Sequence, residues 1–390
     1  MTLAFSVNTP EGTRDRLFSE FLERRQVQRA LTDLFQRRGY GEVITPEVEY
    51  YDLFIQSGNP LPQEAMLKLI DRSGRIMVMR PDCTTPIARV AATKLKSVPL
   101  PQRLYYDQTV FRSNRAHDGG SSEIAQCGIE MIGAMGKKAD LEIIAMAVDA
   151  LRVCGIRQFH VELGHAGFFR TLARQMDMPG DDLERMRAYI EGKNYAALND
   201  LLEPYRGQRA STALRRLPYL FGGVEILDEA QELGGESEAI GYLRQLYQEL
   251  DRAGYGGFVR FDLGLVHQID YYTGVVFRGY AEGAGRPVLS GGRYDALVEL
   301  FGRKAEATGF AVDVDAVGNC LTAVLPKLEL VIHYEDGCLA RALAQVDARP
   351  AGSSELSPCR TLDSTLHLAR EKGAKAVLVV TPEGERRVIL

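Results

Sequence analysis

Strand-forming sequence lies on both sides of a long helical block, and this split constrains the fold more than any other feature. Residues 102–112 and 123–133 are rich in apolar and aromatic side chains and flank a Gly/Ser-rich loop, which predicts a β-hairpin. Strand-like sequence returns at residues 257–265, 270–280 and 307–317. Runs of strands interrupted by helices predict an α+β fold on an antiparallel sheet.

Helical periodicity and composition divide the chain further. Apolar residues at helical spacing predict helices at residues 19–38 and 140–154, and the charged, Leu-rich block between the strand regions predicts a helical insertion. The tail alternates strand and helix signals around a loop at residues 348–358, which predicts a small α/β module. We therefore expect a first core part (1–165), a helical insertion (166–254), a second core part (255–322) and a C-terminal α/β domain (323–390).

Composition disfavours several classes of function. The 390 residues carry a formal net charge of -5 without a Lys/Arg block, so nucleic acid is an unlikely partner. Six cysteines occur without a C-x-x-C pair, which favours reduced thiols over a metal site or a disulfide scaffold. We find neither a secretory signal nor an apolar segment long enough to span a bilayer, and so expect a cytoplasmic protein without a membrane partner.

Common catalytic and cofactor motifs are absent from the sequence. It contains no G-x-x-x-x-G-K-[ST] loop, no H-E-x-x-H, no G-x-S-x-G and no G-x-G-x-x-G after a strand. We therefore predict no metal, no cofactor and no catalytic residue.

Polar and aromatic side chains nevertheless gather on the predicted strands and at their ends: Asp82, Thr84, Gln126, Glu130, Asp270, Tyr271, Tyr272 and Thr273. Gln126 and Glu130 lie four residues apart on one strand and should point to the same face. Carboxylates can bind an ammonium group, and a phenol or carboxylate can bind an imidazole N–H. The alternative is structural: Asp82 caps a turn, Glu130 faces water and the tyrosines pack in the core.

Six segments resemble, in order and spacing, the core of histidyl-tRNA synthetases: residues 10–15 (PEGTRD), 80–84 (RPDCT), 111–115 (FRSNR), 125–133 (AQCGIEMIG), 269–277 (IDYYTGVVF) and 291–302 (GGRYDALVELFG). The resemblance spans residues 8–320 and implies a class II synthetase-like fold.

The same resemblance implies a histidine pocket formed by Asp82, Thr84, Arg112, Gln126, Glu130, His267, Tyr271 and Tyr272. In the family pattern, Asp82 and Thr84 would contact the α-amino group, whereas Glu130 and Tyr272 would face the imidazole. The family usually has Glu where Asp82 stands, which shortens the reach by one methylene and keeps the charge.

The activation machinery departs from the family pattern. Arg112 and Arg115 are retained in motif 2, but Asn114 replaces a glutamate, and Gly120 and Ser122 replace arginines. Three further positions differ, with His267 and Ala316 in place of arginines and Asp313 in place of a glycine. Because adenylate formation needs cations directed at the phosphates and the developing charge, we expect no aminoacylation activity.

A synthetase-like core that lacks these activation arginines and is followed by a short tail resembles, above all, the regulatory subunits of ATP phosphoribosyltransferase. This resemblance implies a short-form catalytic subunit as partner, in the first step of histidine biosynthesis, and a homodimer formed through residues 40–54 within a hetero-oligomer. Free histidine could bind here or on the partner. Two alternatives stay open: a repurposed synthetase paralogue that binds RNA, and an active histidyl-tRNA synthetase.

Overall fold

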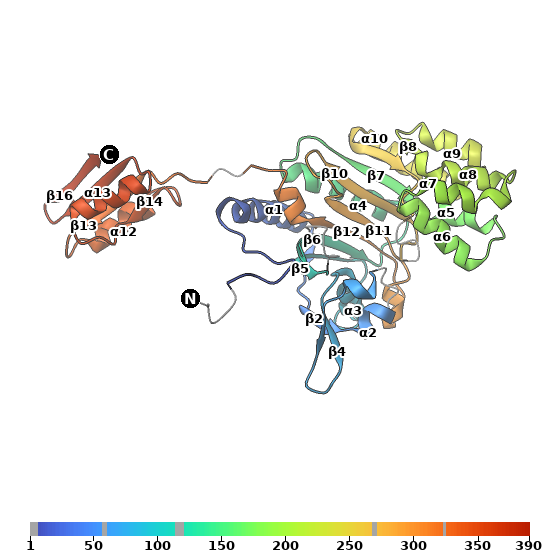
Figure 1. The fold of residues 1–390 in the computed structure, drawn as a ribbon, viewed down its shortest axis with the longest axis horizontal. Coiled ribbons are helices and arrows are strands. Elements are labelled where there is room, and N and C mark those ends of the chain that lie inside the picture. The colour runs from blue at the N-terminus through green and yellow to red at the C-terminus, as the bar shows by residue number, and fades with distance from the viewer. Residues whose placement is uncertain (1–6, 57–60, 114–120, 267–270, 323–324) are drawn as a thin grey trace. The chain divides into compact units, whose positions relative to one another are not determined.

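The chain divides into two compact units, Met1–Thr322 and Ala323–Leu390, each described by itself below (Figure 1). The computed structural model describes residues 7–56, 61–113, 121–266, 271–322 and 325–390. In these described residues, no helix combines the length and the apolar character needed to cross a membrane.

A nine-stranded sheet forms the centre of the first unit in the described part of the chain. Its order is β1-β5-β6-β12-β11-β10-β7-β9-β8. Adjacent strands are antiparallel except for the parallel pairs β1–β5 and β7–β9. The strands are β1 (Gly41–Glu42), β5 (Gln102–Phe111), β6 (Glu123–Ile132), β7 (Phe159–His165), β8 (Phe221–Gly222), β9 (Val259–Asp262), β10 (Val275–Ala281), β11 (Leu289–Arg293) and β12 (Ala307–Asp313). The predicted α+β fold on a mainly antiparallel sheet is confirmed.

Two long helices, α1 (Phe18–Arg37) and α4 (Lys137–Val153), pack against one face of this sheet. Side chains alternate between the faces because successive residues of a strand point in opposite directions. Tyr105 accordingly belongs to the apolar core under α1 and α4, whereas Tyr106 belongs to the core on the opposite face. The second face is therefore available for a binding site.

A smaller layer contributes to that second face. It contains α3 (Thr84–Ala92), α2 (Asp52–Gln56) and a three-stranded sheet of order β2-β4-β3, with β2 (Val48–Tyr50), β3 (Lys68–Ile70) and β4 (Ile76–Met79). The sequence of residues 39–50 (GYGEVITPEVEY) predicts one strand interrupted by Pro46, but β1 and β2 lie in different sheets. Pro46, between them, cannot donate a ladder hydrogen bond, so the chain changes sheets there.

The helices of residues 166–252, called the helical block below, gather at the β7 side of the sheet (Figure 1). They are α5 (Ala166–Arg174), α6 (Gly180–Glu191), α7 (Tyr195–Leu201), α8 (Arg209–Arg216), α9 (Ile226–Gly234) and α10 (Glu238–Arg252). The first unit also contains short 3-10 helices, of which only η2 and η3 lie in the block: η1 (Gln63–Ala65), η2 (Glu203–Tyr205), η3 (Leu217–Tyr219), η4 (Gly256–Phe258) and η5 (Val298–Phe301). Buried Met186, Leu198 and Leu214 join the same apolar core as the sheet, so the block is continuous with the core.

The second unit is a four-stranded sheet of order β14-β13-β15-β16 with a helix on each face. It comprises β13 (Leu330–Tyr334), α12 (Leu339–Asp347), β14 (Ser354–Leu356), α13 (Leu362–Glu371), β15 (Ala376–Thr381) and β16 (Gly384–Ile389). Ile332 packs towards α12, and Val331 packs towards α13. The predicted loop over residues 348–358 contains β14, a short polar strand that its sequence did not reveal.

Candidate functional site

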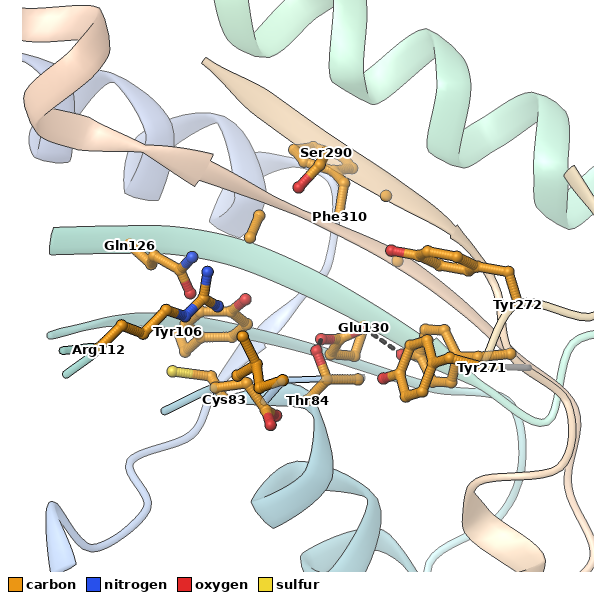
Figure 2. Close-up of a pocket in the computed structure, with 16 residues that line it drawn as sticks. Cys83, Thr84, Tyr106, Arg112, Gln126, Glu130, Tyr271, Tyr272, Ser290 and Phe310 are labelled. Atoms are coloured by element: carbon orange, nitrogen blue, oxygen red, sulfur yellow. Dashed lines mark hydrogen bonds between the residues drawn. The ribbon is translucent and has the colours of Figure 1, made fainter. Parts of the chain in front are cut away.

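A cavity on the second face of the large sheet collects most of the predicted binding residues (Figure 2). Seven of the eight line it, namely Asp82, Thr84, Arg112, Gln126, Glu130, Tyr271 and Tyr272. His267, the eighth, lies outside the described residues, as does Asp270. The cavity offers about 120 Å³ to the centres of water-sized molecules, whereas one water needs roughly 10–15 Å³. It can therefore hold a small organic molecule.

The floor of the cavity is formed by neighbouring strands. Gln126 and Glu130 extend from the same face of β6, opposite Asp313 and Gly309 of β12 in the register of the sheet. A Cβ atom at position 309 would lie 2.0 Å from Oε2 of Glu130 and 2.3 Å from the carbonyl oxygen of Ile129. Only glycine leaves room there, so β12 is shaped around the Glu130 carboxylate.

Glu130 is the buried acidic group of the site, with 2% of its surface exposed. Thr84 donates its hydroxyl to Oε1 at 2.7 Å, and Tyr294 donates its hydroxyl to Oε2. Burial raises the pKa of Glu130 to about 8, against the lowering effect of these two hydrogen bonds, and the nearby Asp82 carboxylate raises it further. This raised pKa favours the protonated form of Glu130 at pH 7.

Tyr294 is a residue that we did not single out from the sequence. It follows β11 within the segment GGRYD, where only its membership of a family motif distinguished it. Its ring stacks on that of Tyr271, with centroids 5.5 Å apart. Tyr106, Ser290 and Phe310 also line the cavity without an earlier signal.

Asp82 has a structural role as well as a place in the cavity. Its Oδ1 accepts a hydrogen bond from the backbone N–H of Thr85 at 2.8 Å, and its Oδ2 accepts from the Thr85 hydroxyl at 3.3 Å. This pairing caps the first turn of α3, as the structural alternative required. The cap also orients the carboxylate, so Asp82 can be both a helix cap and a ligand-binding residue.

Tyr271 and Tyr272 precede β10 rather than open it, because the strand begins at Val275. Their rings meet edge to face with centroids 5.2 Å apart. Burial raises the pKa of both phenols, which keeps them neutral donors. Figure 2 shows Arg112 and Gln126 at the opposite end of the cavity, with Glu130 between the two ends.

Residues 309–316, which correspond to motif 3 of the synthetase family, make internal contacts. Asp313 accepts a hydrogen bond from the backbone N–H of Ala316 at 2.9 Å, which caps α11 (Val314–Gly318), and it pairs with Arg286 at 2.7 Å. Ala316 itself is buried. In motif 2, the backbone N–H of Ser122 donates to the carbonyl of Gly12 at 2.7 Å, while Asn114, Arg115 and Gly120 lie outside the described residues. None of these three described substitutions places a cation in the cavity.

Comparisons with known proteins agree with this architecture. A family model described as histidyl-tRNA synthetase matches residues 12–317. The ATP phosphoribosyltransferase regulatory subunit of Clostridium kluyveri is 43% identical over 79% of this chain and 80% of its own. The protein of the same name from Bacillus cereus (strain ATCC 10987) is 35% identical over 97% of this chain and 92% of its own. This chain belongs to the family of ATP phosphoribosyltransferase regulatory subunits.

Solved structures place this family on the synthetase fold. A crystal structure from Bacillus halodurans, titled ATP phosphoribosyltransferase regulatory subunit/histidyl-tRNA synthetase, superposes with a TM-score of 0.86 at 30% identity and covers 98% of this chain and 100% of its own. Histidyl-tRNA synthetase from Nostoc sp. PCC 7120 shares the fold, with a TM-score of 0.78 at 18% identity over 99% of this chain and 97% of its own. The class II synthetase-like fold predicted from the motifs is confirmed.

Proposed function

We propose that this chain is the non-catalytic regulatory subunit of an ATP phosphoribosyltransferase, that it is required for the activity of a short-form catalytic subunit, and that it binds free histidine in the cavity. The proposal rests on two features found together. An amino-acid-sized cavity surrounds Glu130, and Ala316 in motif 3 stands where the synthetase family has an arginine. A regulator needs only a difference in ligand binding between two states, whereas a synthetase also needs activation chemistry.

The geometry of the cavity supports histidine as its ligand. When Glu130 is ionised, its carboxylate offers about four lone-pair sites and uses one on each oxygen for Thr84 and Tyr294. It can therefore still accept an imidazole N–H, with Tyr272 beside it. Asp82 and Gln126, which also line the cavity, supply acceptors for the ammonium group, and Arg112 supplies positive charge for the carboxylate.

The contacts of motif 3 argue against adenylate formation. An arginine and a glycine at positions 316 and 313 would provide a cation and space for phosphates, but the chain has a buried Ala316 and an acidic Asp313 there. The guanidinium of Arg286 is within 2.7 Å of Asp313, which offsets its charge. Losing one such transition-state donor typically costs on the order of 10² to 10³ in rate. We expect no histidine-dependent exchange between ATP and pyrophosphate.

An apolar surface near residues 40–54 supports the expected homodimer. Val48, Tyr50 and Leu69 are exposed and point to one face of the three-stranded sheet, since Tyr50 and Leu69 both pair with Met77 and Val48 lies two residues before Tyr50. Exposed apolar side chains that share a face are typical of protein interfaces. The change Val48→Asp, at a side chain 38% exposed, should shift sedimentation towards the monomer. Val153→Asp, at a side chain 39% exposed on α4, is the matched control and should leave the dimer intact.

The decisive experiment mixes the full chain with a short-form catalytic subunit and follows phosphoribosyl-ATP formation with and without histidine. We expect activity to appear or rise only when this chain is present. Glu130→Gln should remove any histidine effect that arises in this cavity, and Glu282→Gln, at an exposed carboxylate, should not.

Two outcomes would contradict the proposal. If a cognate catalytic subunit is unaffected by the chain, the regulatory role fails, and salt-dependent tRNA binding and ATP–pyrophosphate exchange become the assays for the alternatives. If activation occurs but Glu130→Gln leaves histidine inhibition unchanged, feedback histidine binds the partner instead of this cavity.

A further inference from the structure

We infer that Arg170 of the helical block is a positioning residue that couples occupancy of the cavity to the block; this inference rests on the proposed binding of histidine. Arg170 lies on α5, outside the cavity, and none of the sequence motifs includes it. Its contact is with the wall segment, residues 271–274, which carries Tyr271 and Tyr272 at one end of the cavity (Figure 2).

Helix α5 holds the wall segment at two carbonyl groups. The guanidinium of Arg170 donates a hydrogen bond to the carbonyl oxygen of Tyr272. The backbone N–H of Ala166, the first residue of α5, donates to the carbonyl oxygen of Gly274 at 3.0 Å. The wall segment and the first turn of the block therefore move together or lose these bonds.

The opposite side of the wall segment is anchored to β11. The backbone N–H of Thr273 donates to the carbonyl of Arg293 at 2.7 Å, and its hydroxyl donates to Oδ2 of Asp295 at 3.0 Å. The side chain of Tyr272 also fits against Gly292, where a Cβ atom would lie 2.7 Å from its ring. The wall segment thus has hydrogen bonds to β11 and the residues just after it on one side, and to the helical block on the other.

A second connection reaches the block through buried charges. Arg293 pairs with Asp140 of α4 at 2.7 Å, and Tyr242 of α10 donates its hydroxyl to the same carboxylate at 2.5 Å. Arg293 and Asp140 are 7% and 1% exposed. Such a buried, paired network holds a defined geometry because breaking one bond leaves a charge unsatisfied. Helix α5 therefore bonds to the wall segment directly, and α10 is connected to it through Asp140 and Arg293.

Coupling follows from these contacts by linkage. A ligand that packs against Tyr271 and Tyr272 restricts the wall segment, and this favours the bond between Tyr272 and Arg170. Any bond that the ligand strengthens must in turn strengthen ligand binding. Removing the guanidinium should therefore weaken histidine binding and also uncouple the block from the ligand, whereas a residue that only stabilised the fold would do neither.

The test measures both quantities on the full chain. Calorimetry gives the histidine affinity, and hydrogen exchange followed by mass spectrometry gives the protection of the α5 amides with and without saturating histidine. The variants are Arg170→Ala and Arg170→Lys, with Arg174→Ala as the matched control, because Arg174 is an exposed arginine of the same helix.

In the unmodified chain, histidine should slow exchange in α5. Arg170→Ala should weaken histidine binding by about tenfold, equivalent to about 1.4 kcal/mol, and should abolish the added protection of α5 at saturation. Arg170→Lys keeps a charged donor and should restore part of both effects. Arg174→Ala should behave like the unmodified chain.

Three results separate the possible failures. If the unmodified chain does not bind histidine, the proposed ligand is wrong and the inference falls with it. If it binds histidine without added protection of α5, the coupling is refuted while the proposed ligand stands. If Arg170→Ala keeps full affinity and full protection, Arg170 is not the positioning residue. Should that variant fail to fold, as judged by circular dichroism, Arg170→Lys decides in the same way.

Discussion

Glu130 should make the stability of this protein depend on pH in an unusual direction. Its pKa rises from 4.5 to about 8 because the folded chain buries the carboxyl group. Between these two values the folded state binds a proton that the unfolded state has released, so the free energy of unfolding falls as pH rises. The 3.5-unit difference, at about 1.36 kcal/mol per unit, corresponds to a loss on the order of 5 kcal/mol across this range.

The substitution Glu130→Gln keeps the shape of the side chain and removes its titration. Unfolding in guanidinium chloride, followed by circular dichroism at pH values from 5 to 8.5, gives the free energy of unfolding of each variant. Other titrating groups, including His165, contribute equally to both chains and cancel in the difference. We expect the stability of the variant relative to the unmodified chain to rise with pH by several kcal/mol.

The control for this prediction is Glu282→Gln, which removes an exposed carboxylate from the same unit. The stability of this variant relative to the unmodified chain supplies the baseline for the comparison. A curve for Glu130→Gln that follows this baseline would refute the reasoning, because it would mean that Glu130 titrates at the same pH in the folded and unfolded chains. The hydrogen bonds donated by Thr84 and Tyr294 would then offset the effect of burial on the pKa of Glu130.

Three further predictions concern packing and charge. Gly309→Ala places a methyl group 2.0 Å from a buried carboxylate oxygen and should lower the free energy of unfolding by about 1–3 kcal/mol, whereas Gly241→Ala, with open space around it on α10, should be neutral or stabilising. Arg89→Met removes the bidentate partner of the buried Glu49 carboxylate and should destabilise by about 3 kcal/mol in denaturant unfolding; adding Glu49→Gln should recover part of this loss. Burial lowers the pKa of His333 from 6.5, so the folded second unit resists protonation and should lose stability as pH falls below that value. Hydrogen exchange in β13 should report this loss, and His333→Gln should remove it.

Much of the fold was predictable because it rests on local patterns. The apolar and aromatic runs of β5 and β6 on either side of a Gly/Ser-rich loop and the helical spacing of α1 are properties of short segments, and the structure contains all three elements close to the predicted residues. The prediction was wrong where local pattern is weak. Strand β14 is three residues long and polar, and residues 39–50 divide between two sheets.

The binding residues were predicted by a different kind of information. Spacing alone suggested that Gln126 and Glu130 share a face, but the grouping of Asp82 with Tyr272 came from motifs seen in a known family. Tyr294 was missed because its importance arises from one contact with a residue 164 positions earlier in the chain. No local pattern encodes a contact of that separation.

The sequence by itself determined which chemical groups this protein has and which it lacks: the carboxylates and phenols of an amino-acid pocket, and an alanine and an aspartate where motif 3 carries an arginine and a glycine. Only the tertiary structure decided how those groups behave. Glu130 is a weak acid because strands distant in sequence exclude water from it, Asp313 is offset by Arg286, and Arg170 reaches the cavity wall from a separate helical block. Burial and long-range pairing depend on how segments pack together, and packing is a property of the whole folded chain.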